Sequence, residues 1–273
     1  METDITKTGE RIIPENIETS AEYLLYLRHL FAYEFARSII PKDSLVLEVG
    51  CGEGYGTNFL SQCVEKVVGL DIDDKTINHA SNKYCSQNCI FKTYNGSKIP
   101  FKDNTFDTII SFQVIEHIQD DKKYISEMRR VLKPSSPCIL TTPNREYRLA
   151  PGQRPWNRFH VREYSTHSLK ELLDTMFYDV TIWGIRGTEE IQKIERGRVE
   201  QIVRISALDP FKLRRFIPES LTPKIIALLK KMIQSNRKSE NNKKFFEQYK
   251  TTDFEIIKDN LGQSLELLGI CIK

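Results

Sequence analysis

The sequence of 273 residues lacks long hydrophobic segments, since nowhere do 18 apolar residues follow one another. A helix that crosses a bilayer needs about 20 predominantly apolar residues, so we expect no membrane span. The opening stretch, METDITKTGERIIP, also lacks the apolar core of a secretory signal peptide. From these two absences we expect a cytoplasmic protein that at most touches the inner face of the membrane.

Closely spaced cysteines are scarce as well. Of the six cysteines, only Cys85 and Cys89 lie near each other, and no second pair completes the spacing of a zinc site. Disulfides belong mainly to oxidising compartments. We therefore expect buried or free thiols in a reducing compartment.

The chain has little net charge, +3, but this value conceals an asymmetry. Residues 211–250 carry 11 Lys and Arg against three Glu, a net charge of +8, so the other residues sum to −5. Apolar residues at helical spacing within 223–233 predict an amphipathic helix in this segment. Two readings stay open: a solvated or packed helical appendage, or a surface for anionic lipid, RNA or a phosphorylated substrate.

The strict dinucleotide-binding pattern GxGxxG is missing too, although residues 45–60 read LVLEVGCGEGYGTNFL. The apolar residues Leu45, Val46, Leu47 and Val49 predict a buried parallel strand. The glycines after them predict a turn at which the backbone can approach a ligand closely. Counted from Gly50 or Gly52, the third glycine of the fingerprint would fall on Tyr55 or Thr57. NAD-dependent oxidoreduction is therefore disfavoured.

What is present, Glu48-x-Gly50-x-Gly52-x-Gly54, resembles motif I (E/DxGxGxG) of the class I S-adenosylmethionine (SAM) methyltransferases. The next apolar run ends in Asp71, an acid placed to accept both ribose hydroxyls. Residues 95–107, NGSKIPFKDNTFD, resemble the family's GDAxxLPFxDxxFD segment, with Asn95 in place of the acid that takes the adenine amino group. The resemblance spans residues 42–183. It implies that SAM, with S-adenosylhomocysteine as product, is held by Glu48, Gly50, Cys51, Gly52, Gly54, Asp71, Ile72, Asn95, Gly96, Phe112 and Gln113.

The order of elements predicts an α/β fold, a Rossmann-like doubly wound sheet with helices on both faces. We expect strands at 45–49, 66–70, 89–93, 106–112, 137–142, 178–184 and 267–272, and helices at 24–40, 56–63, 74–85, 120–132 and 166–176. The spacing of Thr19 and Glu22 is that of a capping box and predicts the start of the first helix. By resemblance, the seventh strand inserts antiparallel beside the sixth. The chain then divides into an N-terminal helical segment (1–41) over the cofactor site, a SAM-binding core (42–184), a basic and largely helical insertion (185–262) and a final strand (263–273).

Two segments after the fourth and fifth strands offer catalytic groups. Gln113-Val-Ile-Glu116-His117 follows the fourth strand, and His160 lies in a loop after the fifth. Methyl transfer to a hydroxyl requires removal of its proton, by a base or with a metal that lowers the hydroxyl's pKa. We favour His160 as the base, with His117 second, and place His29, His79 and His167 on structural or surface positions.

Glu116, His117 and His160 also resemble the metal ligands of magnesium-dependent small-RNA 2′-O-methyltransferases and ubiquinone-pathway O-methyltransferases. In that pattern Gln113 replaces the first Glu, and a neutral amide is a poor ligand for Mg²⁺. A third reading is that the Glu-His pair only orients loops. Metal binding is thus a second hypothesis beside a metal-free base.

The loop 143–164 contains arginines interleaved with aromatic residues, a composition suited to an anionic or sugar-containing acceptor. We therefore expect an O-methyltransferase acting on a sugar, glycan or related small molecule. The alternatives are an RNA-end 2′-O-methyltransferase with a metal site, and a SAM- or nucleotide-binding protein without catalysis.

Overall fold

The computed structural model describes residues 12–207 and 245–273. Its centre is one sheet of eight strands in the order β3-β2-β1-β4-β5-β8-β6-β7. The first five strands run parallel, whereas β8 pairs antiparallel with β5 and β6, and β7 pairs antiparallel with β6. The strands are β1 Leu45–Val49, β2 Lys66–Asp71, β3 Cys89–Thr93, β4 Thr108–Phe112, β5 Pro137–Pro143, β6 Asp179–Gly187, β7 Phe254–Ile257 and β8 Glu266–Ile272.

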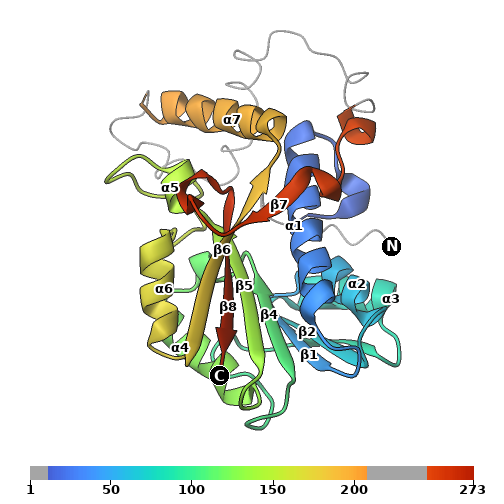
Figure 1. Cartoon of the computed structure of the whole chain (residues 1–273). Coiled ribbons are helices and arrows are strands. Elements are labelled where there is room, and N and C mark those ends of the chain that lie inside the picture. Colours follow the sequence, from blue (N-terminus) through green and yellow to red (C-terminus); the bar gives the residue numbers. More distant parts are fainter. Residues whose placement is uncertain (1–11, 208–244) are drawn as a thin grey trace.

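Helices cover both faces of this sheet (Figure 1). One face carries α1 Ser20–Ile39, α2 Tyr55–Ser61 and α3 Asp74–Tyr84, and the other carries α4 Asp121–Val131 and α6 Thr166–Asp174. The short α5 Arg145–Arg148 and the longer α7 Glu189–Ala207 lie beyond the carboxyl ends of β4 and β5. Single 3-10 turns occur at η1 Pro14–Asn16, η2 Ile115–His117, η4 Thr251–Asp253 and η5 Leu261–Gln263.

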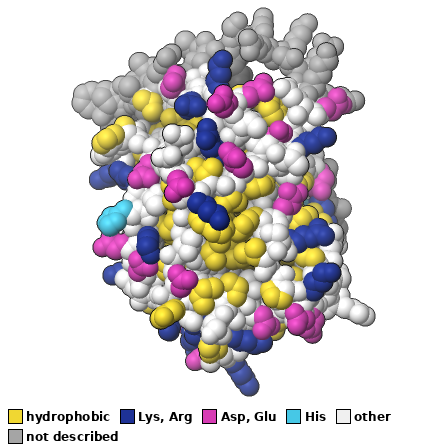
Figure 2. Space-filling model, in the orientation of Figure 1, with side chains coloured by type: hydrophobic (Ala, Val, Ile, Leu, Met, Phe, Trp, Pro, Cys, Tyr) yellow, Lys and Arg dark blue, Asp and Glu magenta, His cyan; other side chains and the backbone are white. Residues whose placement is uncertain are grey.

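The alternation of side chains along the strands divides the core between the two faces. In β1, Leu47 and Val49 pack in the cluster with α4 and α6, while Val46 packs in the cluster with α1 and α2. On the side seen in Figure 2, hydrophobic side chains gather in the middle of the molecule and charged side chains surround them. Strands β1, β4 and β5 are buried on both faces along nearly their whole length, as their mostly apolar sequences predict.

Helix α1 begins where its sequence predicts. The Thr19 hydroxyl accepts the backbone N–H of Glu22 at 3.2 Å, and the Glu22 carboxylate accepts the N–H of Thr19 at 3.0 Å. This reciprocal capping box satisfies two backbone donors that the first turn would leave open. It starts the helix that later brings Arg28 and His29 to the candidate site.

The fold class predicted from the sequence is confirmed, with one strand more than the seven expected. The extra strand is β7, and β6 extends to Gly187, so both ends of the predicted insertion 185–262 belong to the sheet. The predicted amphipathic helix at 223–233 and most of the basic segment 211–250 lie outside the described residues. Within the described ranges, no helix combines the length and the apolar character needed to span a membrane.

Gly56 provides a test of the packing of α1 on α2. A Cβ atom at Gly56 would lie 1.9 Å from Cζ of Tyr33, whose ring is held edge-on against Phe112 at 4.9 Å. Because this ring cannot move aside freely, we expect Gly56→Ala to lower the free energy of unfolding by about 1–3 kcal/mol. Urea unfolding measures the change.

Gly262→Ala is the matched control, since no described atom lies within 4 Å of its added Cβ. We expect it to change stability by less than about 0.5 kcal/mol. Equal stability of the two variants would contradict the packing described for Tyr33.

Candidate active site

The glycine turn after β1 is the first part of the site. Gly50 and Gly52 have φ of +84° and +50°, in the left-handed region that favours glycine. A Cβ at Gly50 would meet Val114 Cγ2 at 2.3 Å, whereas a Cβ at Gly52 would have no described atom within 4 Å. The turn is therefore closed by packing at Gly50 and open at Gly52.

Asp71, at the end of β2, fixes this turn. Its Oδ2 accepts the backbone N–H of Gly52 at 3.0 Å, and its Oδ1 accepts the N–H of Asp73 at 3.0 Å. The carboxylate thus lies beside the open side of the turn. Binding of the ribose hydroxyls by this carboxylate stays a prediction.

Glu48 and Cys51 lie on the closed side. Both are buried, and the Glu48 carboxylate accepts the hydroxyls of Tyr33 and Thr57. Burial raises the pKa of Glu48 to about 7, while these two hydrogen bonds act in the opposite direction. In this arrangement Glu48 holds α1 and α2 together behind the glycine turn.

The residues predicted around the adenine lie at the ends of β2 and β3. Ile72 is 66% exposed to solvent. A Cβ atom added at Gly96 would lie 3.2 Å from Cγ2 of Ile72. The Asn95 carbonyl oxygen accepts the backbone N–H groups of Ser97 and Lys98 at 3.0 and 3.1 Å. That oxygen is therefore used to hold the turn, and the amide nitrogen is the polar group that Asn95 can turn toward a base.

Gln113 redirects the chain at the end of β4, just after the buried Phe112. The backbone angle φ of Gln113 is +58°, a conformation that costs a residue other than glycine about 1–3 kcal/mol. Two bonds hold it there: its N–H donates to the Thr141 carbonyl at 2.9 Å, and its Nε2 donates to the Thr141 hydroxyl at 3.1 Å. The strained turn leads directly into η2, which carries Glu116 and His117.

Glu116, His117 and His160 come together, as the sequence predicts, with one potential ligand atom from each within 4.8 Å of the others. Glu116 is buried and accepts the Thr142 hydroxyl at 3.0 Å. Burial raises its pKa to about 7, and the nearby His160 opposes the shift. The two imidazole rings lie edge to face, with centroids 4.9 Å apart.

Each imidazole is oriented through its Nδ1 atom. His117 Nδ1 lies 3.0 Å from the Phe159 carbonyl oxygen, and His160 Nδ1 lies 2.9 Å from Oε1 of the buried Glu163. Because both partners are acceptors, Nδ1 carries the proton and the lone pair of the neutral ring is on Nε2. Glu163 is a site residue that our sequence reasoning missed, although it follows His160 by only three positions.

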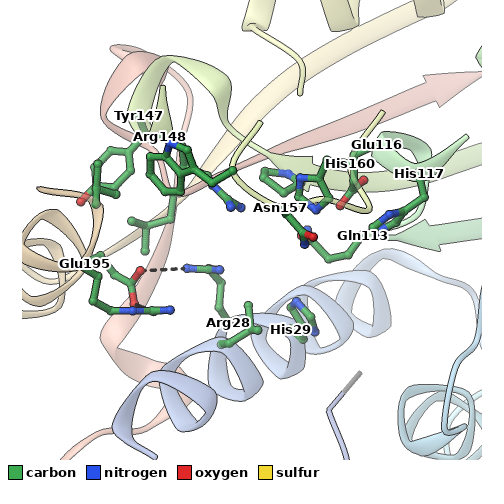
Figure 3. A pocket seen from close by; sticks show the side chains of 16 residues that line it. Arg28, His29, Gln113, Glu116, His117, Tyr147, Arg148, Asn157, His160 and Glu195 are labelled. Carbon is green, nitrogen blue, oxygen red and sulfur yellow. Dashed lines mark hydrogen bonds and ion pairs between the residues drawn. The ribbon is translucent and has the colours of Figure 1, made fainter. Parts of the chain in front are cut away.

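A cavity of about 180 Å³ is bordered by Glu116, His117 and His160. Its lining comes from α1, α5, α7, η2 and the loop after β5 (Figure 3). Arg28 crosses its floor, donates to the carboxylate of Glu266 and lies 4.0 Å from Glu195 on α7. These three residues were not predicted. A signal existed for Arg28, because it occupies the apolar stripe of its helix, one turn after Leu24.

The other histidines divide between cavity and surface. His29 lines the cavity, and burial, together with the charge of Arg28, lowers its pKa to about 3. His79 lies 3.7 Å from Glu53, and the His167 side chain is 90% exposed. The structural or surface roles expected for these two are compatible with these positions, whereas His29 faces the candidate site.

Comparisons with known proteins agree with this geometry. Residues 47–140 match the family model described as a methyltransferase domain. A probable S-adenosylmethionine-dependent methyltransferase of Mycolicibacterium smegmatis is 38% identical over 175 residues, which are 63% of this chain and 65% of that relative. The chain therefore spans slightly less than two thirds of that relative's length.

More distant relatives differ in the kind of atom that they methylate according to their names. A ubiquinone biosynthesis O-methyltransferase of Bartonella tribocorum is 28% identical over 46% of this chain and 53% of its own length. A norajmaline N-methyltransferase of Rauvolfia serpentina is 33% identical over 37% of this chain and 35% of its own. Similarity alone therefore does not fix the atom on which this chain would act.

Solved structures extend the similarity of fold to nearly the whole chain. A SAM-dependent methyltransferase from Thermotoga maritima, described as a possible histamine N-methyltransferase, superposes with a TM-score of 0.57 at 13% identity. The match covers 93% of this chain and 94% of that one. The matched domain and the relative named as a SAM-dependent methyltransferase support a class I SAM methyltransferase family for this chain, and the solved structure shows the likeness of the fold.

Proposed function

We propose that this protein transfers a methyl group from SAM to an oxygen atom of a sugar, glycan or related small molecule. The observation that carries the proposal is the position of the cavity. It adjoins Gln113 at the carboxyl end of β4, where open α/β sheets bind their ligands, and two oriented imidazoles border it.

The residues present fit SAM. The open side of the glycine turn at Gly52 admits the backbone approach of the amino-acid portion, Asp71 can accept the ribose hydroxyls, and the exposed Ile72 offers an apolar surface to the adenine. Gly50, Gly54, Gly96, Phe112 and Gln113 complete the proposed set, with Glu48 and Cys51 supporting it from behind. SAM, when bound, supplies an activated methyl group.

His160 is the proposed general base. Its Nδ1–H is held by Glu163, so Nε2 is the atom that can accept a proton from an acceptor hydroxyl in the cavity. The carboxylate also stabilises the imidazolium that forms. His117, oriented by the Phe159 carbonyl, is the second candidate.

A metal-assisted reaction is the second candidate function, and the convergence of Glu116, His117 and His160 favours it. The partners of these side chains, Thr142, the Phe159 carbonyl and Glu163, resemble the outer contacts that orient metal ligands. A bound ion would lower the pKa of a hydroxyl. Two imidazoles suit a transition metal better than Mg²⁺, which prefers oxygen ligands.

The remaining alternatives depend on other parts of the chain. An RNA-end 2′-O-methyltransferase, like a peripheral contact with the inner face of the membrane, would use the basic segment 211–250, most of which lies outside the described residues. A SAM-binding protein without catalysis would bind SAM and show no turnover. We retain a cytoplasmic location and the division at 1–41, 42–184, 185–262 and 263–273 as proposals.

The cofactor site is tested at Asp71. Asp71→Asn removes charge-assisted hydrogen bonds worth about 1.5–3 kcal/mol, so the affinity for S-adenosylhomocysteine should fall about tenfold or more in calorimetry. Asp74→Asn, an exposed acid in the first turn of α3, is the control and should bind like the wild type. Unchanged affinity in Asp71→Asn would refute the placement.

Both candidate mechanisms require His160. We expect His160→Gln to lower turnover by about 10²–10⁴-fold without changing the affinity for S-adenosylhomocysteine, because only the proton acceptor is lost. Turnover is read as S-adenosylhomocysteine released from SAM against a panel of sugars and glycans. His167→Gln, at an exposed position, is the control.

Chelation completes this test. EDTA should leave the wild-type rate unchanged if His160 acts as a metal-free base. Loss of activity with EDTA and recovery with Mn²⁺ or Mg²⁺ would instead support the metal site. A fully active His160→Gln enzyme would exclude both roles.

A further inference from the structure

Three arginines line the cavity, and two of them are already matched by carboxylates. Arg28 donates to Glu266, and Arg198 donates to Glu195 at 2.6 Å. These contacts place a carboxylate directly against each of the two guanidinium groups and offset its charge. Neither is placed to supply a new charge to a ligand.

Arg148 differs from these two. Among the described residues its guanidinium makes no hydrogen bond, and its one ion pair, with Glu163, spans 3.5 Å. The side chain stacks on Trp156, with Cζ 5.4 Å from the ring centroid, and Figure 3 shows it reaching into the cavity. A stacked guanidinium keeps its N–H edge available, and this edge has the geometry that binds a carboxylate through two parallel hydrogen bonds.

Two more polar atoms on the cavity wall lack a partner. Nε1 of Trp156 and Nε2 of His29 are buried without a hydrogen bond to any described residue. A buried donor or acceptor left unpaired costs about 1–3 kcal/mol, and such atoms commonly belong to sites that a ligand completes. The indole N–H belongs to Trp156, the ring on which Arg148 stacks. An oxygen atom of a ligand bound to Arg148 could therefore also accept a hydrogen bond from this N–H.

We propose that Arg148, stacked on Trp156, binds a carboxylate of the methyl acceptor, so that the acceptor is a hydroxylated acid such as an acidic sugar. This inference deepens the proposed function and rests on it. A singly charged group is favoured over a phosphate dianion because Glu195 lines the cavity and Glu163 lies 3.5 Å from Arg148, and both carboxylates would repel a second negative charge.

The test compares acids with their neutral amides. D-Glucuronate and D-galacturonate, each beside its primary amide, are titrated into the full chain with and without S-adenosylhomocysteine and followed by ligand-observed NMR. We expect the acids to bind at least about tenfold more tightly than the amides. Arg148→Gln should abolish this difference, and Arg148→Lys should retain only part of it.

Arg145→Gln is the matched control, because Arg145 belongs to the same short helix and does not line the cavity. It should behave like the wild type, and melting curves establish that all variants are folded. Equal binding of acid and amide, absence of uronate binding, or an acid preference that survives in Arg148→Gln would each overturn the proposal.

The two proposals fail separately. If S-adenosylhomocysteine binds and the uronates do not, the carboxylate site is refuted while the proposed methyl transfer stands. If S-adenosylhomocysteine itself does not bind, the proposed function is refuted. The titrations without it still decide whether Arg148 prefers acids.

Discussion

The arrangement of the cavity depends on one backbone carbonyl, that of Glu116. It accepts the N–H of Val161 at 2.8 Å and so joins η2, just after β4, to the distant end of the loop after β5. Arg162 and Tyr164 strengthen the contact by binding Asp121 at the start of α4. Since His160 precedes Val161, this bond is what brings its ring beside Glu116 and His117.

A second constraint, a set of buried ion pairs, forms the floor of the cavity. Arg28 of α1 reaches Glu266 of β8, 238 positions away, and approaches Glu195 of α7. A buried charge without a partner is strongly unfavourable, so the three elements must meet in this one arrangement. The ion pairs therefore define the shape of the cavity floor more than they supply binding groups. Arg148 differs, because its ion pair with Glu163 spans 3.5 Å and its guanidinium makes no hydrogen bond to a described residue.

The sequence predicted most of the sheet because local patterns encode it. Runs such as Leu45–Val49 are apolar except at Glu48, and Thr19 with Glu22 marks a helix start. Strand β7 was missed because Phe254–Ile257 is short, includes Glu255 and is defined only by pairing with β6. The convergence of Glu116, His117 and His160 was predictable from strand order. The Arg28–Glu266 pair was not, because nothing local links two residues so far apart.

Glu116 is the residue on which the two candidate mechanisms diverge. Its burial favours the protonated carboxyl, and the nearby His160 opposes this shift of the pKa. A metal ion would reverse this preference, because a carboxylate ligand must be ionised, and it would also occupy the lone pair that His160 needs as a base. Proton removal by His160 and metal coordination by the cluster therefore exclude each other, although both depend on the same three side chains and on the Glu116 carbonyl that assembles them.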